Sequence, residues 1–303
     1  GLRKLDGLGE DETPDYRKTS RPFGLNCGFT MGESSQYIIL MDDQLAIELG
    51  AAIYGSVPTV ASHADGGKRS ISAPGAGNYL TLAQAVASIR DLLGQDALAN
   101  ETLVQAHGTS TPQNRVTESE VLSRVAKAFG LDSLSVTAIK SQIGHSQGTA
   151  GGDQLAASLG AFASQTAPGI GTVETLAPDV TQDGLDFVLK SRQQRITAAL
   201  INAKGFGGNN ATAAILSPEA TATLLKSRHG AIPLEGSDEV QARQARYRHK
   251  IDHGTIEILY HYGENIIEGS DLEIGPESID VPGFGNNMTL NQAKTKYSDL
   301  IKS

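Results

Sequence analysis

The stretch AIKSQIGHSQGTAGG, residues 138–152, joins a strand to a helix and places a lysine and a histidine in the junction. Before it, LSVTAI (134–139) is a short apolar run typical of a buried strand, and DQLAASLGAFAS (153–164) has the spacing of a helix. The junction itself is rich in glycine and offers little bulk for a core. In α/β sheets ligands bind at the carboxyl ends of strands, so this junction is a candidate site.

Apolar runs of strand length alternate with helix-like segments up to about residue 217. The expected strands are YIILM (37–41), AAIYGSVPTVA (51–61), TLVQA (102–106), LSVTAI (134–139), TAALINA (197–203) and ATAAIL (211–216). The expected helices are TLAQAVASIRDLL (81–93), VTESEVLSRVAKAFG (116–130) and DQLAASLGAFAS (153–164). This alternation predicts a layered α/β fold with helices on both faces of a mixed sheet.

The texture of the chain changes after Pro218. SPEATATLLKSRHG and DEVQARQARYRHKIDHG are expected to be helical, and TIEILYHYG (255–263) alternates like a half-exposed strand. We therefore expect a boundary that divides residues 1–217 from an appended region, 218–303.

A second histidine also follows a strand. VQAHGTSTP places His107 directly after the apolar run 102–106, in a turn of small residues. A lone His-Gly turn is usually structural. Because strand ends meet at one edge of a parallel sheet, we expect His107, Lys140 and His145 to converge there.

Composition excludes several classes of function. The 303 residues, 39% of them hydrophobic, suffice for a sizeable core, and the net charge of −9 argues against a nucleic-acid surface. No apolar stretch is long enough to cross a bilayer and no signal peptide is evident, so we expect a soluble cytoplasmic protein. The chain has one cysteine, Cys27, and no Cys/His set with metal spacing, so neither a metal nor a cofactor is expected.

Four motifs in order resemble those of one enzyme family. QAHGTSTP, KSQIGHSQGTAG and KGFGGNN, preceded by RPFGLNCGFTMGESSQYIILMDD (21–43), are similar to the C-terminal signatures of β-ketoacyl-acyl carrier protein synthases, which have the thiolase fold. The resemblance covers about residues 1–217 and corresponds to the part of such an enzyme that follows its nucleophile. The extension suggests one of the longer bacterial members.

The resemblance implies roles for the two histidines and the lysine. These enzymes condense an acyl thioester with malonyl-acyl carrier protein as carbon dioxide leaves, and His107 and His145 correspond to neutral imidazoles that donate hydrogen bonds to the enolate oxygen. Such fixed donors contribute about 3–4 kcal/mol each. Lys140 is expected to orient His145, and its charge together with a following helix N-terminus is expected to keep His145 neutral. The glycines around His145 would admit backbone and acyl chain.

The resemblance also assigns substrate-binding residues. Thr109 and Thr111 correspond to hydroxyls that bind the phosphopantetheine arm of the acyl carrier protein, and Ser72 loosely matches another. Phe206, with Gly207 and Gly208 beside it in KGFGGNN, corresponds to an aromatic gate next to the nucleophile. The alternatives are polar turn residues for the threonines and a core aromatic for Phe206.

Cys27 lies in the wrong motif to be the nucleophile. It stands between Asn26 and Gly28 with no helix after it to lower its thiol pKa. We therefore expect the nucleophilic cysteine in an N-terminal half missing from this chain, which by itself would be inactive, and a homodimer as is usual in the family.

Two departures and two competing functions accompany this interpretation. Arg115 replaces a family aspartate, although Glu118 occupies the place of a family acid, and Gln154, beside Asp153, stands where many members have a structural glutamate. A non-catalytic partner subunit of the chain-length-factor type would lack the cysteine but need not keep His107, Lys140 and His145. A thiolase would require a second cysteine, and none follows residue 27.

Overall fold

The structure is a computed structural model that describes residues 15, 19–25, 28–68, 73–230, 236–257, 266–283 and 288–290. The chain divides into two compact units, Gly1–Arg243 and Gln244–Ser303. The division falls within a helix, α9 (Asp238–Asp252). The expected domain boundary after residue 217 stays a prediction.

The larger unit contains the α/β layers. Its strands are β1 (Ser56–Ala64), β2 (Thr102–Gln105), β3 (Ser133–Thr137), β4 (Thr166–Ala167), β5 (Gly184–Phe187), β6 (Arg192–Gln193), β7 (Ala198–Lys204) and β8 (Asn209–Leu216). Its helices are α2 (Asp43–Glu48), α3 (Ala76–Leu93), α4 (Gln95–Asn100), α5 (Pro112–Ala128), α6 (Lys140–Ile143), α7 (Ala150–Ser164) and α8 (Pro218–His229), with a 3-10 turn, η2, at Gln147–Thr149.

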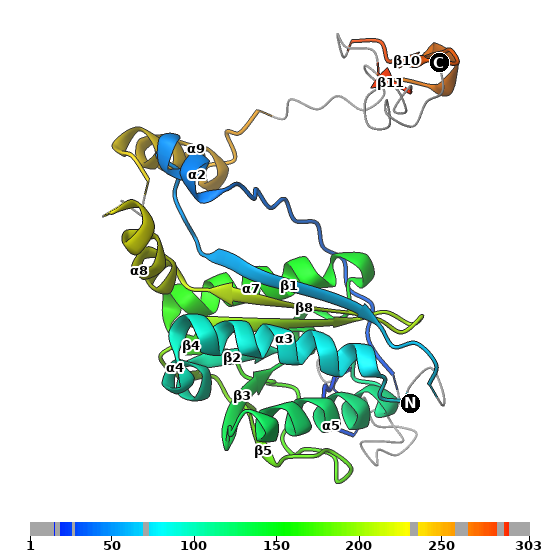
Figure 1. Ribbon diagram of the computed structural model, residues 1–303, viewed down its shortest axis with the longest axis vertical. Helices are drawn as coiled ribbons and strands as arrows, with labels where there is room; N and C mark the ends of the chain where they lie inside the picture. The colour runs from blue at the N-terminus through cyan, green and yellow to red at the C-terminus, as the bar shows by residue number, and fades with distance from the viewer. Residues whose placement is uncertain are drawn as a thin grey trace, which may run out of the picture. The chain divides into compact units, whose positions relative to one another are not determined.

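Six of these strands form one mixed sheet in the order β1-β8-β7-β2-β3-β5 (Figure 1). Strands β7, β2, β3 and β5 run parallel, whereas β8 is antiparallel to both β7 and β1. Helices α3, α4 and α5 pack on one face and α7 on the other. The predicted fold class, a mixed sheet with helices on both faces, is confirmed.

The strand side chains alternate between two cores because successive residues point to opposite faces. Val104 and Leu200 face α3 and α5 in the larger core, whereas Leu103 and Ile201 belong to the smaller core with Phe162 of α7. In β7 the even-numbered residues therefore face α3 and α5. This alternation decides which side chains meet below the strand ends.

Three of the expected strands are not found as predicted or are only partly described. The strand expected at 37–41 is wrong: this segment is extended but pairs with no strand in the described chain, and Tyr37 and Ile39 are 97% and 83% exposed. An extended segment becomes a strand only when a neighbour satisfies its backbone groups. The strand expected at 51–61 begins later, at Ser56. The strand expected at 255–263 lies mostly outside the described residues.

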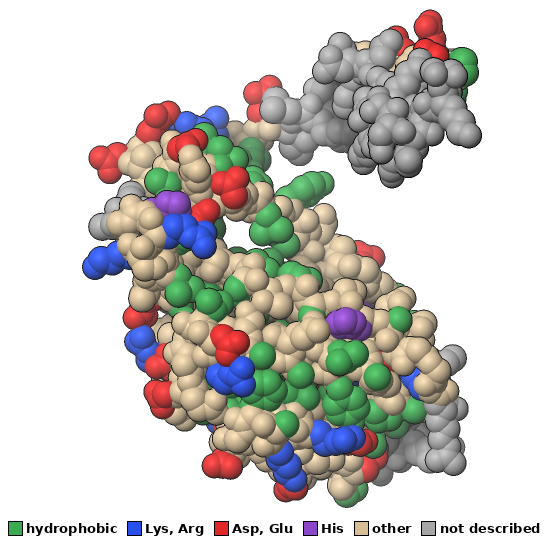
Figure 2. Space-filling view, in the orientation of Figure 1, with side chains coloured by type: hydrophobic (Ala, Val, Ile, Leu, Met, Phe, Trp, Pro, Cys, Tyr) green, Lys and Arg blue, Asp and Glu red, His purple; other side chains and the backbone are tan. Residues whose placement is uncertain are grey.

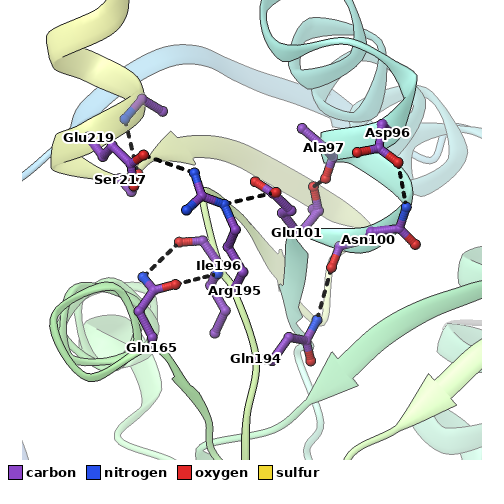
Figure 3. Close-up of polar contacts among 12 residues, drawn as sticks. Asp96, Ala97, Asn100, Glu101, Gln165, Gln194, Arg195, Ile196, Ser217 and Glu219 are labelled. Atoms are coloured by element: carbon purple, nitrogen blue, oxygen red, sulfur yellow. Dashed lines mark hydrogen bonds and ion pairs between the residues drawn. The ribbon is translucent and has the colours of Figure 1, made fainter.

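Polar contacts close the amino ends of β2 and β7, away from the candidate site (Figure 3). The Arg195 guanidinium lies between two carboxylates, 2.9 Å from Glu101 Oε1 and 2.8 Å from Glu219 Oε1. The Gln165 side chain exchanges hydrogen bonds with the backbone of Ile196 at 2.8 and 3.2 Å. These contacts tie β2, β7, α7 and α8 together at one end of the sheet.

The smaller unit holds a three-stranded antiparallel sheet, β11-β10-β9. Its strands are β9 (Glu273–Ile274), β10 (Ser278–Asp280) and β11 (Met288–Thr289), and a 3-10 turn, η3 (Gly269–Asp271), precedes them. In the part of the chain that the structure describes, no helix combines the length and apolar character that crossing a bilayer requires. The described residues likewise contain no group of three or more metal-ligating side chains.

The molecular surface carries both signs of charge. On the face shown in Figure 2, lysine and arginine side chains are interspersed with aspartate and glutamate side chains. No broad positive patch appears on this face, in keeping with the net charge of −9. Nucleic acid is therefore a poor match for this face.

Gln154 joins α7 to two strands, β2 and β7, near their carboxyl ends. Its Nε2 group lies 2.8 Å from the carbonyl oxygen of Gln105, 2.9 Å from that of Ala106 and 3.1 Å from that of Asn202. Gln154 is fully buried, so its N–H groups are satisfied by these carbonyl oxygens rather than by bulk water. The two N–H groups of this amide are shared among three acceptors, whereas an ionised glutamate has no hydrogen to donate.

We expect Gln154→Glu to lower the free energy of unfolding by about 3 kcal/mol at pH 8, because a buried carboxylate would face three carbonyl oxygens. Burial would raise the pKa of the new carboxyl group, so the loss should shrink as the pH falls toward 5. Chemical denaturation at both pH values measures the effect. Gln154→Met, an apolar control of similar length, should show no pH dependence; equal losses for Gln154→Glu at both pH values would contradict the account.

Candidate active site

The structure brings together the two histidines that the sequence pattern singled out. His107 follows β2, and His145 follows the short helix α6 that Lys140 begins after β3. The imidazole centroids of His107 and His145 are 5.6 Å apart with the ring planes at 90°. Phe29 lies edge-on to His145, 5.4 Å between ring centroids. The expected convergence at the carboxyl edge of the sheet is present.

A buried carboxylate fixes the turn that carries His107. Glu118 of α5 accepts the backbone N–H of His107 at 2.7 Å and that of Gly108 at 2.9 Å, one on each oxygen. The side-chain amides of Asn202 and Asn114 donate to the same two oxygens at 2.7 and 2.9 Å. Four donors compensate the cost of burying this charge. Glu118 therefore connects α5, β7 and the histidine turn.

Glycine is required in this turn. Gly108 has a φ of +49°, and a Cβ atom there would approach the Cβ of Ala138 to 2.6 Å. The left-handed backbone and the close neighbour both disfavour a side chain. The backbone of His107 can therefore reach Glu118 because the next residue is glycine.

Both imidazoles have the same tautomer. The backbone N–H of Gln147 donates to Nδ1 of His145 at 3.2 Å, and the backbone N–H of Lys204 donates to Nδ1 of His107 at 3.4 Å. A nitrogen that accepts a hydrogen bond carries no proton, so the proton of each neutral ring lies on Nε2. Each histidine thus offers one Nε2–H donor.

The surroundings keep both imidazoles un-ionised. Burial, then the Lys140 charge, lowers the pKa of His145 to about 4, although Asp153 opposes this shift. Burial, followed by the charges of Lys140, Lys204 and His145, holds the pKa of His107 well below its usual value. Two neutral donors face a site with positive surroundings, an arrangement suited to an oxygen that gains negative charge.

Lys140 acts on the site through its charge. Its Nζ atom is buried and has no hydrogen-bond partner among the described residues. Burial lowers the pKa of Lys140 to about 8, with Glu118 and Asp153 opposing the change. No hydrogen bond joins Lys140 to His145 among the described residues, and the backbone N–H of Gln147 holds the ring. An orienting role for Lys140 stays a prediction.

The helix expected at 153–164 begins closer to His145 than predicted: the turn η2 starts at Gln147, and α7 follows at Ala150. The low pKa of His145 comes first from burial and second from Lys140. An additional effect of the helix N-terminus stays a prediction.

The glycines near His145 serve backbone approach at two positions. At Gly144, where φ is +74°, a Cβ would lie 2.8 Å from the carbonyl oxygen of Thr30, which accepts the N–H of His145 at 2.7 Å. At Gly152 a Cβ would meet the Gln36 side chain. Gly148 and Gly151 have open space instead. The approach of an acyl chain stays a prediction.

The predicted pantetheine-binding hydroxyls lie in the turn after His107. Thr109 and Thr111 share a hydrogen bond of 3.1 Å, and Thr111 also accepts the N–H of Asn114 at 3.3 Å as the N-cap of α5. Thr111 thus has a structural function independent of any ligand. Ser72 lies outside the described residues.

Phe206, Gly207 and Gly208 form the tight turn between β7 and β8. Phe206 is 79% exposed, so it does not pack in a core of the described chain. Gly208 has a φ of +83°, and a Cβ there would lie 3.3 Å from the Asp65 side chain. The glycine requirement at 208 is thus structural, and a gating role for Phe206 stays a prediction.

Sequence reasoning missed part of the site. It noted Glu118 only as a family acid and assigned no function to Asn202 or Lys204, whose contacts become visible once β7 lies beside β2. Arg115, noted as a departure, forms an ion pair with Asp179 at 2.7 Å. The available signal was the end of each parallel strand, where β7 follows the same rule as β2 and β3.

The comparisons place this site in a known family. Residues 54–174 match the family described as "Beta-ketoacyl synthase, C-terminal domain". The chain is 45% identical to the beta-ketoacyl-[acyl-carrier-protein] synthase FabY of Pseudomonas aeruginosa over 99% of its own length and 48% of that protein. It is 35% identical to 3-oxoacyl-[acyl-carrier-protein] synthase 2 of Synechocystis over 66% of its length and 47% of that protein. The chain thus spans about half the length of these relatives.

Solved structures agree with the sequence relatives. The crystal structure of the noncanonical ketosynthase FabY from P. aeruginosa superposes with a TM-score of 0.81 and 44% identity, over 100% of this chain and 48% of that one. A type II polyketide ketosynthase, AntDE, solved with its acyl-carrier protein AntF, shares the fold at a TM-score of 0.56 and 24% identity, over 71% of this chain and 52% of that one. With the histidine motifs placed as described, the chain belongs to the β-ketoacyl synthase family and has its thiolase-like fold.

Proposed function

We propose that this chain supplies the decarboxylation half of a site that condenses an acyl thioester with malonyl-acyl carrier protein in fatty acid or polyketide synthesis. The observation that carries the proposal is the pair of neutral imidazoles, His107 and His145, each with its proton on Nε2. Burial, and after it the ammonium of Lys140, keeps both rings un-ionised. A site for enolate chemistry needs such donors.

The chemistry uses these donors in one step. The bond between the malonyl carboxylate and the neighbouring carbon breaks, and carbon dioxide leaves. The electron pair of that bond stays with the carbon and forms an enolate, whose negative charge lies on the thioester oxygen. The Nε2–H groups of His107 and His145 stabilise that oxygen. The enolate carbon then attacks the acyl thioester carbonyl, and the thiolate that carried the acyl group leaves. No cofactor is needed for this balance.

The nucleophile belongs, in this proposal, to residues outside the chain. The relatives are about twice as long as the part that this chain spans. Cys27 lies outside the described residues, in a motif that does not match a nucleophile. The exposed apolar segment at 37–41 supports a further layer, because monomers rarely expose contiguous apolar surface of this kind.

The remaining partners follow from the same proposal. An acyl carrier protein would present the malonyl group on its phosphopantetheine arm, with Thr109 and Thr111 at the arm and Phe206 as gate. Gly207 and Gly208 would leave room for the substrate. We further propose a cytoplasmic homodimer in which 218–303 is an appendage of the enzyme.

A chain-length-factor-like partner subunit is the second candidate function. Such a subunit keeps the fold but performs no chemistry. The four donors on Glu118 and the matched tautomers favour the enzyme, because a subunit without chemistry has no need of a fixed donor pair.

His145→Ala in the full-length protein should reduce carbon dioxide release from malonyl-acyl carrier protein at least a hundredfold. Transfer of the acyl group to the nucleophile should persist, since His145 serves the enolate. Release of labelled carbon dioxide and acyl-enzyme formation measure the two steps. In the unsubstituted protein, release should fall as the pH approaches 4, where His145 gains a proton. Normal release by the variant would refute the assignment.

This chain alone should neither condense substrates nor form an acyl-enzyme at Cys27. Mass spectrometry after incubation with an acyl donor or a cerulenin-like epoxide should find Cys27 unmodified. The full-length protein serves as the positive control, with labelling at a different cysteine. Stoichiometric labelling of Cys27 would reverse both the motif assignment and the expected location of the nucleophile.

Phe206→Ala should change condensation kinetics with little loss of stability, because the ring is mostly exposed. Phe187→Ala is the matched control: Phe187 is 9% exposed with its ring 4.7 Å from that of Phe23, and its loss should cost about 3–5 kcal/mol. Thermal unfolding and kinetics with both substrates separate the two. A large stability loss with unchanged kinetics for Phe206→Ala would end the gate proposal.

A further inference from the structure

Lys204 is a buried cation that the proposed chemistry leaves unexplained. It ends β7 opposite Asn210 of β8, on the sheet face that packs against α3 and α5. Its Nζ atom is buried and has no hydrogen-bond partner among the described residues. An unpartnered ammonium inside a protein is costly, so its retention calls for a reason.

The nearest carboxylates already have other donors. Glu118 accepts four hydrogen bonds from backbone and amide groups. Asp65 accepts from the Lys68 ammonium at 2.7 Å, the Asn210 amide at 2.7 Å and the Asn78 N–H at 3.3 Å. Both carboxylates lie close enough to oppose the fall in the pKa of Lys204 that burial causes. Neither forms an ion pair with Lys204 in the described structure, so its charge remains available to other neighbours.

The neighbour that Lys204 contacts is His107. The backbone N–H of Lys204 donates to Nδ1 of the ring at 3.4 Å, and its side-chain charge lowers the pKa of the same ring. The charged and titratable groups around His107 come from four segments: Lys204 of β7, Lys140 of α6, Glu118 of α5 and His145 in the turn before η2. Glu118 holds the backbone of His107, while the two lysines act on its ring.

We propose that Lys204 is a positioning residue for His107: its backbone N–H holds Nδ1 of the ring, and its buried ammonium group adds to burial and Lys140 in keeping the ring un-ionised with its proton on Nε2. This role rests on the proposed decarboxylation at His107 and His145. An imidazolium at His107 would carry a proton on Nδ1 and lose the hydrogen bond from the Lys204 backbone. The buried positive charge of Lys204 opposes that protonation.

The test compares Lys204→Met with Lys204→Arg in the full-length protein, with Lys68→Met as the matched control. Lys68 belongs to the same polar network but bonds Asp65 rather than His107. Lys204→Met should reduce carbon dioxide release from malonyl-acyl carrier protein severalfold more at pH 5.5 than at pH 8. Lys204→Arg should restore the profile, and Lys68→Met should keep it. Acyl transfer should be unchanged in all three.

A direct titration separates this inference from the proposed function. In protein labelled with 13C at histidine Cε1, the His107 signal, assigned by its loss in His107→Gln, should titrate at higher pH in Lys204→Met. Lys204→Gln replaces Lys204→Met if the latter does not fold. An unchanged His107 midpoint, or an equal loss of release at both pH values, would overturn the role of Lys204. If the His107 midpoint is raised in Lys204→Met but the unsubstituted protein releases no carbon dioxide, the role of Lys204 stands and only the proposed function is overturned.

Discussion

The carboxylate of Glu118 is the contact on which the geometry of the candidate site depends. It collects two backbone N–H groups from the turn after β2, one amide from β7 and one from its own helix. A buried carboxylate persists only when donors replace the water it has lost. The turn, the helix and the strand must therefore be in place together. That requirement sets where the His107 ring stands relative to His145.

Burial and charge then act in the same direction on the two rings. Burial disfavours imidazolium, and unpaired ammonium groups disfavour it further. Backbone N–H groups at each Nδ1 complete the arrangement by selecting one tautomer. The site therefore holds two neutral donors near buried ammonium groups, an arrangement suited to a developing oxyanion. Polar side chains alone would not have produced this combination.

Local patterns revealed much of this arrangement but not its details. The apolar spacing of Leu82, Val86 and Ile89 correctly predicted the body of α3. Its start at Ala76 was not predicted, because the N-cap residue Gly75 has no side chain that could form a capping bond and mark the start. The convergence of His107 and His145 followed from their places at strand ends. The tautomers could not be predicted, since the donors are backbone N–H groups, which every residue except proline carries. Segment 37–41 has a strand pattern without a strand because pairing depends on a neighbour beyond the segment itself.

The charges that lower the pKa values of the two histidines are buried, and this affects how the site responds to ionic strength. At physiological salt, mobile ions largely screen exposed charges that lie more than about 8 Å apart, but they screen buried charges much less. Lys140 is 2% exposed, and the Lys204 ammonium is buried as well. The protonation of His107 and His145 is therefore insulated from salt, whereas the exposed charges of the surface are not. In the proposed function, chemistry at the histidines and binding at the surface would thus respond to different properties of the solution.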